Sequence, residues 1–163
     1  MPFRKKVIHI IKIVQGNILD APEDIICHQV NTKSVMGAGL AKQIRNKYPE
    51  VYPSYQRYCK GCKDGNPQNL LGEVQTILCS DGKIVANLFG QYDYGRDKQY
   101  TDYNALKQSL ESILTIAKMF NDSIAIPYGI GCGLAGGSWD IVYSIIEEVF
   151  KDYDVTIYQL EKR

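Results

Sequence analysis

Residues 25–41 read IICHQVNTKSVMGAGLA, and this stretch decides the fold class. Its first part is a short apolar run, which predicts a strand buried inside a sheet. A turn-rich loop follows, and helix-forming residues then extend from Ala38 to Lys47, so a helix is expected to stop before Pro49. A strand, a glycine-containing loop and a helix in direct succession predict an α/β protein.

The rest of the chain continues this alternation. Further strands are expected at 7–14, 72–79, 83–88, 123–126 and 155–160, and further helices near 52–58 and over 103–120 and 139–150. Asp81-Gly82 between two apolar runs predicts an antiparallel hairpin, so the sheet should be mixed but mostly parallel. Residues 1–163 are expected to form one domain with helices on both faces of that sheet.

The last predicted helix has a recognisable start and an apolar face. Ser138 is a good capping residue for its first turn. The helical period assigns its inner face to Ile141, Ile145 and Val149.

Composition argues against several classes of function. The chain is 45% hydrophobic and 23% charged, as in ordinary globular proteins, and its formal net charge is only +1. Many nucleic-acid binders have a strong basic excess that this chain lacks. No apolar run approaches the roughly 20 residues of a membrane-spanning helix, and the N-terminus does not resemble a signal peptide. A cytoplasmic protein without a membrane partner is therefore expected.

The cysteine pattern points to neither a disulfide framework nor a metal centre. The chain has an odd number of cysteines: Cys27, Cys59, Cys62, Cys79 and Cys132. Cys59 and Cys62 form a CxxC pair near the end of a predicted helix, and no second pair follows at the spacing of a zinc site. We expect no metal and no cofactor.

Two glycine-rich loops are the strongest functional signal in the chain. Residues 36–41 (MGAGLA) and 129–137 (GIGCGLAGG) each follow a predicted strand and precede a predicted helix. Glycine lets the backbone approach a ligand closely, and a helix N-terminus adds partial positive charge. Either loop alone would favour a tight turn that needs a positive φ. Two such loops at the carboxyl ends of parallel strands favour a diphosphate ligand.

These loops, with three neighbouring motifs, resemble the macrodomain family. The motifs are GNIL at 16–19, HQVN at 28–31 and IPYGIGCGL at 126–134, the last followed by Trp139. The resemblance covers nearly the whole chain and implies a three-layer α/β/α macrodomain fold. It also implies a cleft that binds ADP-ribose or a derivative of it.

Within the family, the chain is similar to two branches with different chemistry. Segments 48–72 and 89–103 look more like the branch that dephosphorylates ADP-ribose 1″-phosphate. The other branch removes ADP-ribose from protein or nucleic acid through an active lysine, which would fall near Gln91. Its partner aspartate would fall at Ala135, and Lys98 could replace the lysine only if its loop folded back.

The resemblance also implies binding roles, residue by residue. Adenine would be held by Asn17, which replaces the aspartate of many macrodomains, and by Ile18, with Tyr158 nearby. The distal ribose would be bonded by Asn31 and surrounded by Gly37, Ala38 and Gly39. The diphosphate would lie on Gly131, Cys132, Gly133 and Leu134.

His28 is the candidate catalytic residue. An imidazole titrates near neutral pH and can move a proton to or from water or a leaving oxygen. A histidine also stands at this place in macrodomains of the phosphatase type. The competing interpretation is a buried histidine bonded to a backbone carbonyl.

A charged loop completes the candidate site. Arg96 could hold a phosphate through two parallel hydrogen bonds, and Asp93 or Asp97 could carry a second proton. The competing interpretation is a solvated loop with surface ion pairs of little energetic value.

We expect the chain to hydrolyse an ADP-ribose derivative at the distal ribose, with ADP-ribose 1″-phosphate as the first choice of substrate. The alternatives are a non-catalytic reader or sponge of ADP-ribose and a hydrolase of ADP-ribosylated protein or nucleic acid.

Overall fold

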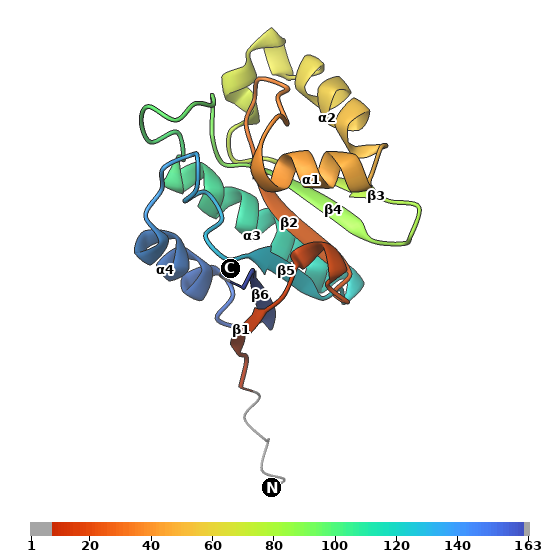
Figure 1. The fold of residues 1–163 in the computed structure, drawn as a ribbon, viewed down its shortest axis with the longest axis vertical. Coiled ribbons are helices and arrows are strands. Elements are labelled where there is room, and N and C mark those ends of the chain that lie inside the picture. The colour runs from red at the N-terminus through yellow and green to blue at the C-terminus, as the bar shows by residue number, and fades with distance from the viewer. Residues whose placement is uncertain (1–7, 162–163) are drawn as a thin grey trace, which may run out of the picture.

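The computed structural model describes residues 8–161, which form a sheet covered by helices (Figure 1). The strands are β1 Ile11–Gln15, β2 Ile25–Val30, β3 Val74–Leu78, β4 Ile84–Phe89, β5 Ile124–Pro127 and β6 Val155–Gln159. The helices are α1 Gly39–Lys47, α2 Val51–Lys60, α3 Tyr103–Phe120 and α4 Trp139–Val149. Short 3-10 turns lie at η1 Ile18–Asp20, η2 Lys63–Gly65 and η3 Pro67–Leu70.

The sheet is mixed, as the sequence predicted. Its strand order is β1-β6-β5-β2-β4-β3. All neighbouring strands are parallel except β3 and β4, which form the predicted antiparallel hairpin. Gly82 in the hairpin turn has a φ of +87°, a conformation that glycine adopts without steric cost.

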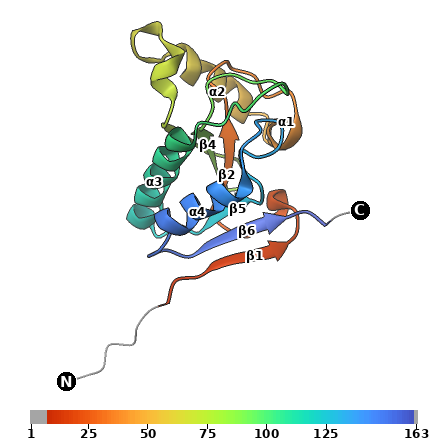
Figure 2. The same cartoon turned by 90° about the vertical axis from the view of Figure 1, so that its left-hand side faces the viewer.

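Helices cover both faces of the sheet, so the molecule has three layers. Figure 2 shows α3 on one side of β2 and α1 on the other. The apolar side chains of α3 and α4 pack on one face in a cluster that includes Cys27 and Leu88. On the opposite face α1 and α2 pack in a second cluster that includes Val30 and Phe89. Alternate residues of β2 therefore point into two different cores.

Two details of the predicted elements are wrong. The first strand does not extend over 7–14, because β1 begins at Ile11, which pairs with the first residue of β6, Val155. Ile8 and Ile10 precede this pairing and are exposed, and Val7 lies outside the described residues. A strand gains its hydrogen bonds from a neighbour, so apolar alternation alone does not set its length.

The inner face of α4 also differs from the prediction. Ile141 is 45% exposed, whereas Val142 and Ile146 are fully buried. The predicted pair Ile141 and Ile145 and the buried pair Val142 and Ile146 are both four residues apart. The helical period therefore could not show which pair faces the core. Val149 is buried as predicted, and Ser138 stands at the predicted cap position without a side-chain capping bond.

The sheet opens between β2 and β5, and this opening positions the site. The two strands pair only at their first residues, Ile25 with Ile124 and Ile26 with Ala125. Beyond Ala125 the two strands separate, and β5 ends at Pro127. A crevice at the carboxyl ends of parallel strands is where open α/β sheets bind ligands. No helix within residues 8–161 is long and apolar enough to cross a membrane.

Candidate functional site

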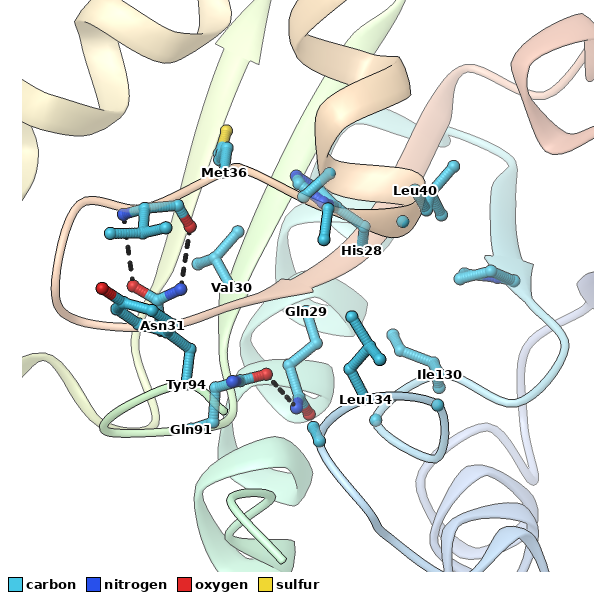
Figure 3. Close-up of a pocket in the computed structure, with 18 of the residues that line it drawn as sticks. His28, Gln29, Val30, Asn31, Met36, Leu40, Gln91, Tyr94, Ile130 and Leu134 are labelled. Carbon is cyan, nitrogen blue, oxygen red and sulfur yellow. Dashed lines mark hydrogen bonds between the residues drawn. The ribbon is translucent and has the colours of Figure 1, made fainter. Parts of the chain in front are cut away.

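A cavity of about 580 Å³ lies where β2 and β5 separate (Figure 3). Its wall combines the end of β2, the loop before α1, the loop after β4 and the glycine-rich loop after β5. Many of the predicted site residues line it: His28, Asn31, Gly37, Ala38, Gly39, Gly131, Gly133 and Leu134. The structure thus brings both predicted glycine loops to one cavity.

The electrostatic character of this cavity is positive. Arg96 is the only formally charged side chain in its wall within the described part of the chain. The ion pairs found over residues 8–161 are those of Lys107 with Glu148 and of His9 with Asp154, so Arg96 belongs to none. The N-terminus of α1, at Gly39, also borders the cavity and adds partial positive charge. These features suit an anionic ligand.

The backbone of the second glycine loop requires glycine at three places, of which Gly129 and Gly131 line the cavity and Gly136 does not. Gly129 and Gly131 have φ values of +77° and +74°, in the left-handed region that side chains with a Cβ rarely adopt. Leu134 in the same loop is exposed at the mouth of the cavity. This conformation leaves the loop backbone beside the cavity with little side-chain cover.

His28 is buried in the wall, with only 2% of its surface exposed. Its Nε2 lies 2.5 Å from Asn87 Oδ1, and the Asn87 amide nitrogen donates to Gln75 Oε1. Because Asn87 presents an oxygen, Nε2 carries the hydrogen and Nδ1 is left as an acceptor. Within residues 8–161 no hydrogen-bond partner faces this Nδ1. The partner of His28 is thus a side-chain amide and not the backbone carbonyl of the competing interpretation.

Burial changes the charge of His28. Loss of solvation lowers the pKa of His28 from 6.5 to about 4, although the bond to Asn87 opposes this change. The imidazole is therefore neutral at physiological pH. A neutral imidazole with a free Nδ1 can accept a proton and is poorly suited to donate one.

Asn31 is buried and its amide is largely engaged by its own loop. Nδ2 donates to the carbonyl of Val35 at 2.8 Å, and Oδ1 accepts from the backbone of Lys33 at 2.9 Å. The Tyr55 hydroxyl donates to the main-chain oxygen of Asn31 at 2.5 Å. Asn31 therefore shapes the loop around the predicted ribose position. Tyr55 was missed, because its helical spacing with Tyr52 and Tyr58 indicated only a helix.

Four predicted site residues do not line this cavity. Asn17 accepts from the backbone of Leu19 and begins η1, while Ile18 is buried beneath it. Tyr158 packs with Ile18 in a small core cluster. Leu40 packs against the same cluster and also lines the cavity, so these residues lie next to it.

Cys132 is the fourth of these residues. Its thiol lies 3.4 Å from the carbonyl of Ile130, and burial raises its pKa to about 11. It is therefore a protonated thiol beneath the loop and not a candidate nucleophile.

The charged loop after β4 contributes only part of its predicted set. Arg96 lines the cavity, but Asp93, Asp97 and Lys98 do not. Asp97 accepts a hydrogen bond from Tyr100, and the Lys98 ammonium lies over the ring of Tyr100.

The two positions at which the lysine-dependent branch would carry its lysine and aspartate do line the cavity. The resemblance would place the lysine near Gln91 and the aspartate at Ala135, and both of these residues line the cavity. Sequence reasoning also missed Gln29 and Thr101, which join the loops around the cavity, because isolated polar residues in apolar or loop segments give no periodic signal.

Comparison with known proteins supports these observations. Residues 27–146 match the family model of the Macro domain. Over 92% of its length the chain is 30% identical to the ADP-ribose glycohydrolase OARD1 of Bos taurus, of which it covers 91%. Over 92% it is 26% identical to an ADP-ribose 1″-phosphate phosphatase of Saccharomyces cerevisiae, of which it covers 98%.

Other relatives are longer than this chain. A DNA ADP-ribosyl glycohydrolase of Thermus aquaticus is 27% identical over 86% of the chain, which spans only 38% of that protein. Among solved structures, the macrodomain of Mycobacterium tuberculosis DarG matches 92% of the chain with a TM-score of 0.77 at 22% identity, and the chain covers 98% of it. The family match spans most of the described residues and includes both sides of the cavity, so this chain belongs to the Macro domain family.

Proposed function

We propose that this chain binds ADP-ribose and hydrolyses an ADP-ribose derivative at the distal ribose, with ADP-ribose 1″-phosphate as its preferred substrate. The observation that carries the proposal is the cavity wall, which holds one arginine, a neutral histidine and no carboxylate or lysine in the described residues. Such a wall attracts a phosphate and does not repel it. We also propose that residues 1–163 act as one domain.

Each part of the ligand has a proposed partner. Asn17, Ile18 and Tyr158 hold the adenine beside the cavity, and the loop of Gly131, Cys132, Gly133 and Leu134 receives the diphosphate. Asn31 and the loop of Gly37, Ala38 and Gly39 surround the distal ribose. Arg96 pairs with the terminal phosphate.

His28 is the proposed proton acceptor. Its Nδ1 takes a proton from water while the water oxygen forms a bond to phosphorus. The bond between phosphorus and the C1″ oxygen breaks, and the proton is returned to that oxygen. The products are ADP-ribose and inorganic phosphate, so atoms and charge balance. Asn87 keeps the hydrogen on Nε2 and leaves Nδ1 as the acceptor. Because Nδ1 is buried, the proposed step requires water to reach it when the substrate binds.

Phosphate release from ADP-ribose 1″-phosphate by the parent and His28→Ala tests this assignment. A fall of about 100-fold or more in the variant, with ADP-ribose affinity retained, supports His28 as the proton carrier. Equal release by both proteins would keep the enzyme and discard His28. Binding of ADP-ribose without any release would instead indicate a reader.

A second candidate function is an ADP-ribosyl hydrolase acting on modified protein or nucleic acid. It is favoured by the relatives named ADP-ribose glycohydrolase and DNA ADP-ribosyl glycohydrolase. Gln91 and Ala135 stand against the lysine-dependent route, because glutamine has no amine to attack an anomeric carbon and alanine has no carboxylate to assist it. Release of ADP-ribose from ADP-ribosylated DNA or protein, measured beside phosphate release, decides between the two substrates.

A further inference from the structure

One side-chain amide at the base of the cavity connects three separate segments. Gln29 lies on β2, and its Nε2 donates to Gln91 Oε1 at 2.8 Å (Figure 3). The same nitrogen donates to Thr101 Oγ1 at 2.9 Å. Thr101 in turn donates to the carbonyl of Gly131 at 2.6 Å. The network therefore ties β2 to the loop after β4 and to the glycine-rich loop after β5.

The direction of each hydrogen bond in this network is fixed by its neighbours. Gln91 uses its own nitrogen to donate to the carbonyl of Asp93, so its oxygen must face Gln29. Thr101 has a single hydroxyl hydrogen, which Gly131 receives, so Thr101 must accept from Gln29. Two acceptors thus require two hydrogens from one group. A terminal amide supplies them, whereas glutamate and methionine do not.

This arrangement leaves one buried acceptor without a hydrogen-bond partner. Gln29 Oε1 is buried and meets no hydrogen-bond donor among residues 8–161. Leaving a buried carbonyl unpaired costs free energy, and such groups in native proteins call for an explanation. Here the explanation is that the Gln29 nitrogen must face Gln91 and Thr101, which turns the Gln29 oxygen away from any donor in the described part of the chain.

Two glycines allow the segments to approach the Gln29 amide. A Cβ added at Gly90 would lie 2.3 Å from Gln29 Oε1, and one added at Gly131 would lie 2.9 Å from it. Real side chains do not tolerate such distances, so the backbone on both sides packs directly on the amide. Glycine is therefore required at position 131 for two reasons: the close approach of Gln29 and the left-handed backbone conformation.

The glycine-rich loop is fastened at a second point by the same neighbouring loop. The backbone amides of Tyr100 and Thr101 both donate to the carbonyl of Ala135, at 2.7 and 3.2 Å. Gly133 and Leu134, which line the cavity, lie between the two fastened positions, Gly131 and Ala135. The loop also has internal hydrogen bonds, such as that from the Gly137 amide to the Gly131 carbonyl at 2.9 Å, so the network adds to them by fixing the loop to its neighbours.

We infer that Gln29 and Thr101 are positioning residues that hold the glycine-rich loop in its ligand-receiving conformation before a ligand arrives. A loop that is already ordered loses less conformational entropy on binding, so affinity rises without new contacts. The ligand in this inference rests on the proposed function, but the ordering of the loop does not. Neither residue contacts the reacting atoms in the mechanism above.

The test compares the parent with Gln29→Met and Thr101→Val, which keep side-chain size and remove donors or acceptors. Thr101→Ser restores the hydroxyl. Thr115→Val is the matched control, because the exposed Thr115 hydroxyl donates to the main-chain oxygen of Glu111 within α3 and not to either loop. Hydrogen exchange of residues 129–137 in the free protein reports loop order. Calorimetric titrations with ADP-ribose and with adenosine, which has no diphosphate, report the effect on binding.

We expect about 10-fold faster exchange in the loop and about 10-fold weaker ADP-ribose binding for both variants, as loss of one or two hydrogen bonds implies. Adenosine binding should change less than about 2-fold, since that ligand does not reach the loop. Thr101→Ser should restore the parent values, and Thr115→Val should retain them.

Two results would overturn the inference, and a third would limit it to the ordering of the loop. Unchanged exchange in both variants would show that the loop is ordered without the network. An equal loss of affinity for ADP-ribose and adenosine would assign the network to the stability of the whole fold. If the parent binds no ADP-ribose, the proposed function fails, and the exchange measurement alone then decides whether the network orders the loop. Should Gln29→Met fail to fold, Thr101→Val carries the same comparison.

Discussion

His28 and Arg96 line the same cavity but differ in charge at neutral pH. The guanidinium is always protonated, while burial keeps the imidazole neutral. The site therefore combines a fixed positive charge with an uncharged proton acceptor. Predictions about both residues follow from this difference.

The pH dependence of stability should report the buried His28. In the unfolded chain its pKa is near 6.5, and in the folded protein it is about 4. Between these values the unfolded state binds more protons, so the free energy of unfolding falls as the pH is lowered from about 6.5 to about 4. The full effect is about 3 kcal/mol, at 1.36 kcal/mol per pH unit. Urea titrations across this range measure it.

His28→Gln is the comparison for this measurement. The variant should show a flatter profile between pH 6.5 and 4, because glutamine does not titrate. Several carboxyl groups also have a lowered pKa and contribute at the acid end of this range: Asp24, Glu50, Asp81 and Asp97. Parent and variant share that contribution, so the difference between their profiles reports His28. Parallel profiles for parent and variant would contradict the assignment of a low pKa to His28.

Arg96 should select for the terminal phosphate. Arg96→Gln is expected to lower kcat/KM for ADP-ribose 1″-phosphate by about 10- to 100-fold, as loss of a charged hydrogen bond implies. Affinity for ADP-ribose should change much less. Lys98→Gln is the matched control from the same loop, because Lys98 does not line the cavity. Similar losses in both variants would mean that only the overall charge of the loop matters.

At the scale of elements, the loop after β5 and helix α4 show how neighbours decide the role of a residue. Gly131 and Gly133 belong to the same loop, yet only Gly131 has a positive φ and a close contact with Gln29. Ile141 and Ile146 belong to the same helix, yet only Ile146 is buried. Each pair gives a matched experiment.

Gly131→Ala should destabilise the protein by about 1–3 kcal/mol, through backbone strain and the clash with Gln29. Gly133→Ala should cost well under 1 kcal/mol, because a Cβ there meets nothing within 4 Å. Chemical denaturation of both variants makes the comparison. Equal costs would show that the loop adjusts freely around position 131.

Ile146→Ala should cost about 2–5 kcal/mol, the usual range for truncating a buried isoleucine. Ile141→Ala should stay within about 0.5 kcal/mol, because its side chain is exposed. A larger loss of stability for Ile141→Ala than for Ile146→Ala would instead support the inner face that the sequence predicted for α4.

For the whole molecule, ligand binding and folding should be linked. If ADP-ribose binds only the folded chain, a concentration 100 times the Kd stabilises it by about 2.7 kcal/mol. For a domain of this size the midpoint of thermal unfolding should rise by about 5–10 °C. Adenosine or inorganic phosphate at the same concentration should give smaller shifts, since each covers only part of the proposed site. No shift with saturating ADP-ribose would contradict the proposed function.

The sequence by itself determined the order of the elements, the hairpin at Asp81-Gly82, the two glycine loops and the membership of the family. The first three depend on neighbours in the chain, through turn chemistry, short apolar runs and local periodicity, whereas the family was indicated by the resemblance of motifs such as HQVN at 28–31. Only the tertiary structure decided where β1 begins, which face of α4 is buried, how His28 is charged and how Gln29 joins the loops. Those features depend on partners far along the chain, such as Asn87 for His28 and Thr101 for Gln29. Solvation, packing and hydrogen-bond direction arise from such distant contacts, and no local pattern in the sequence encodes them.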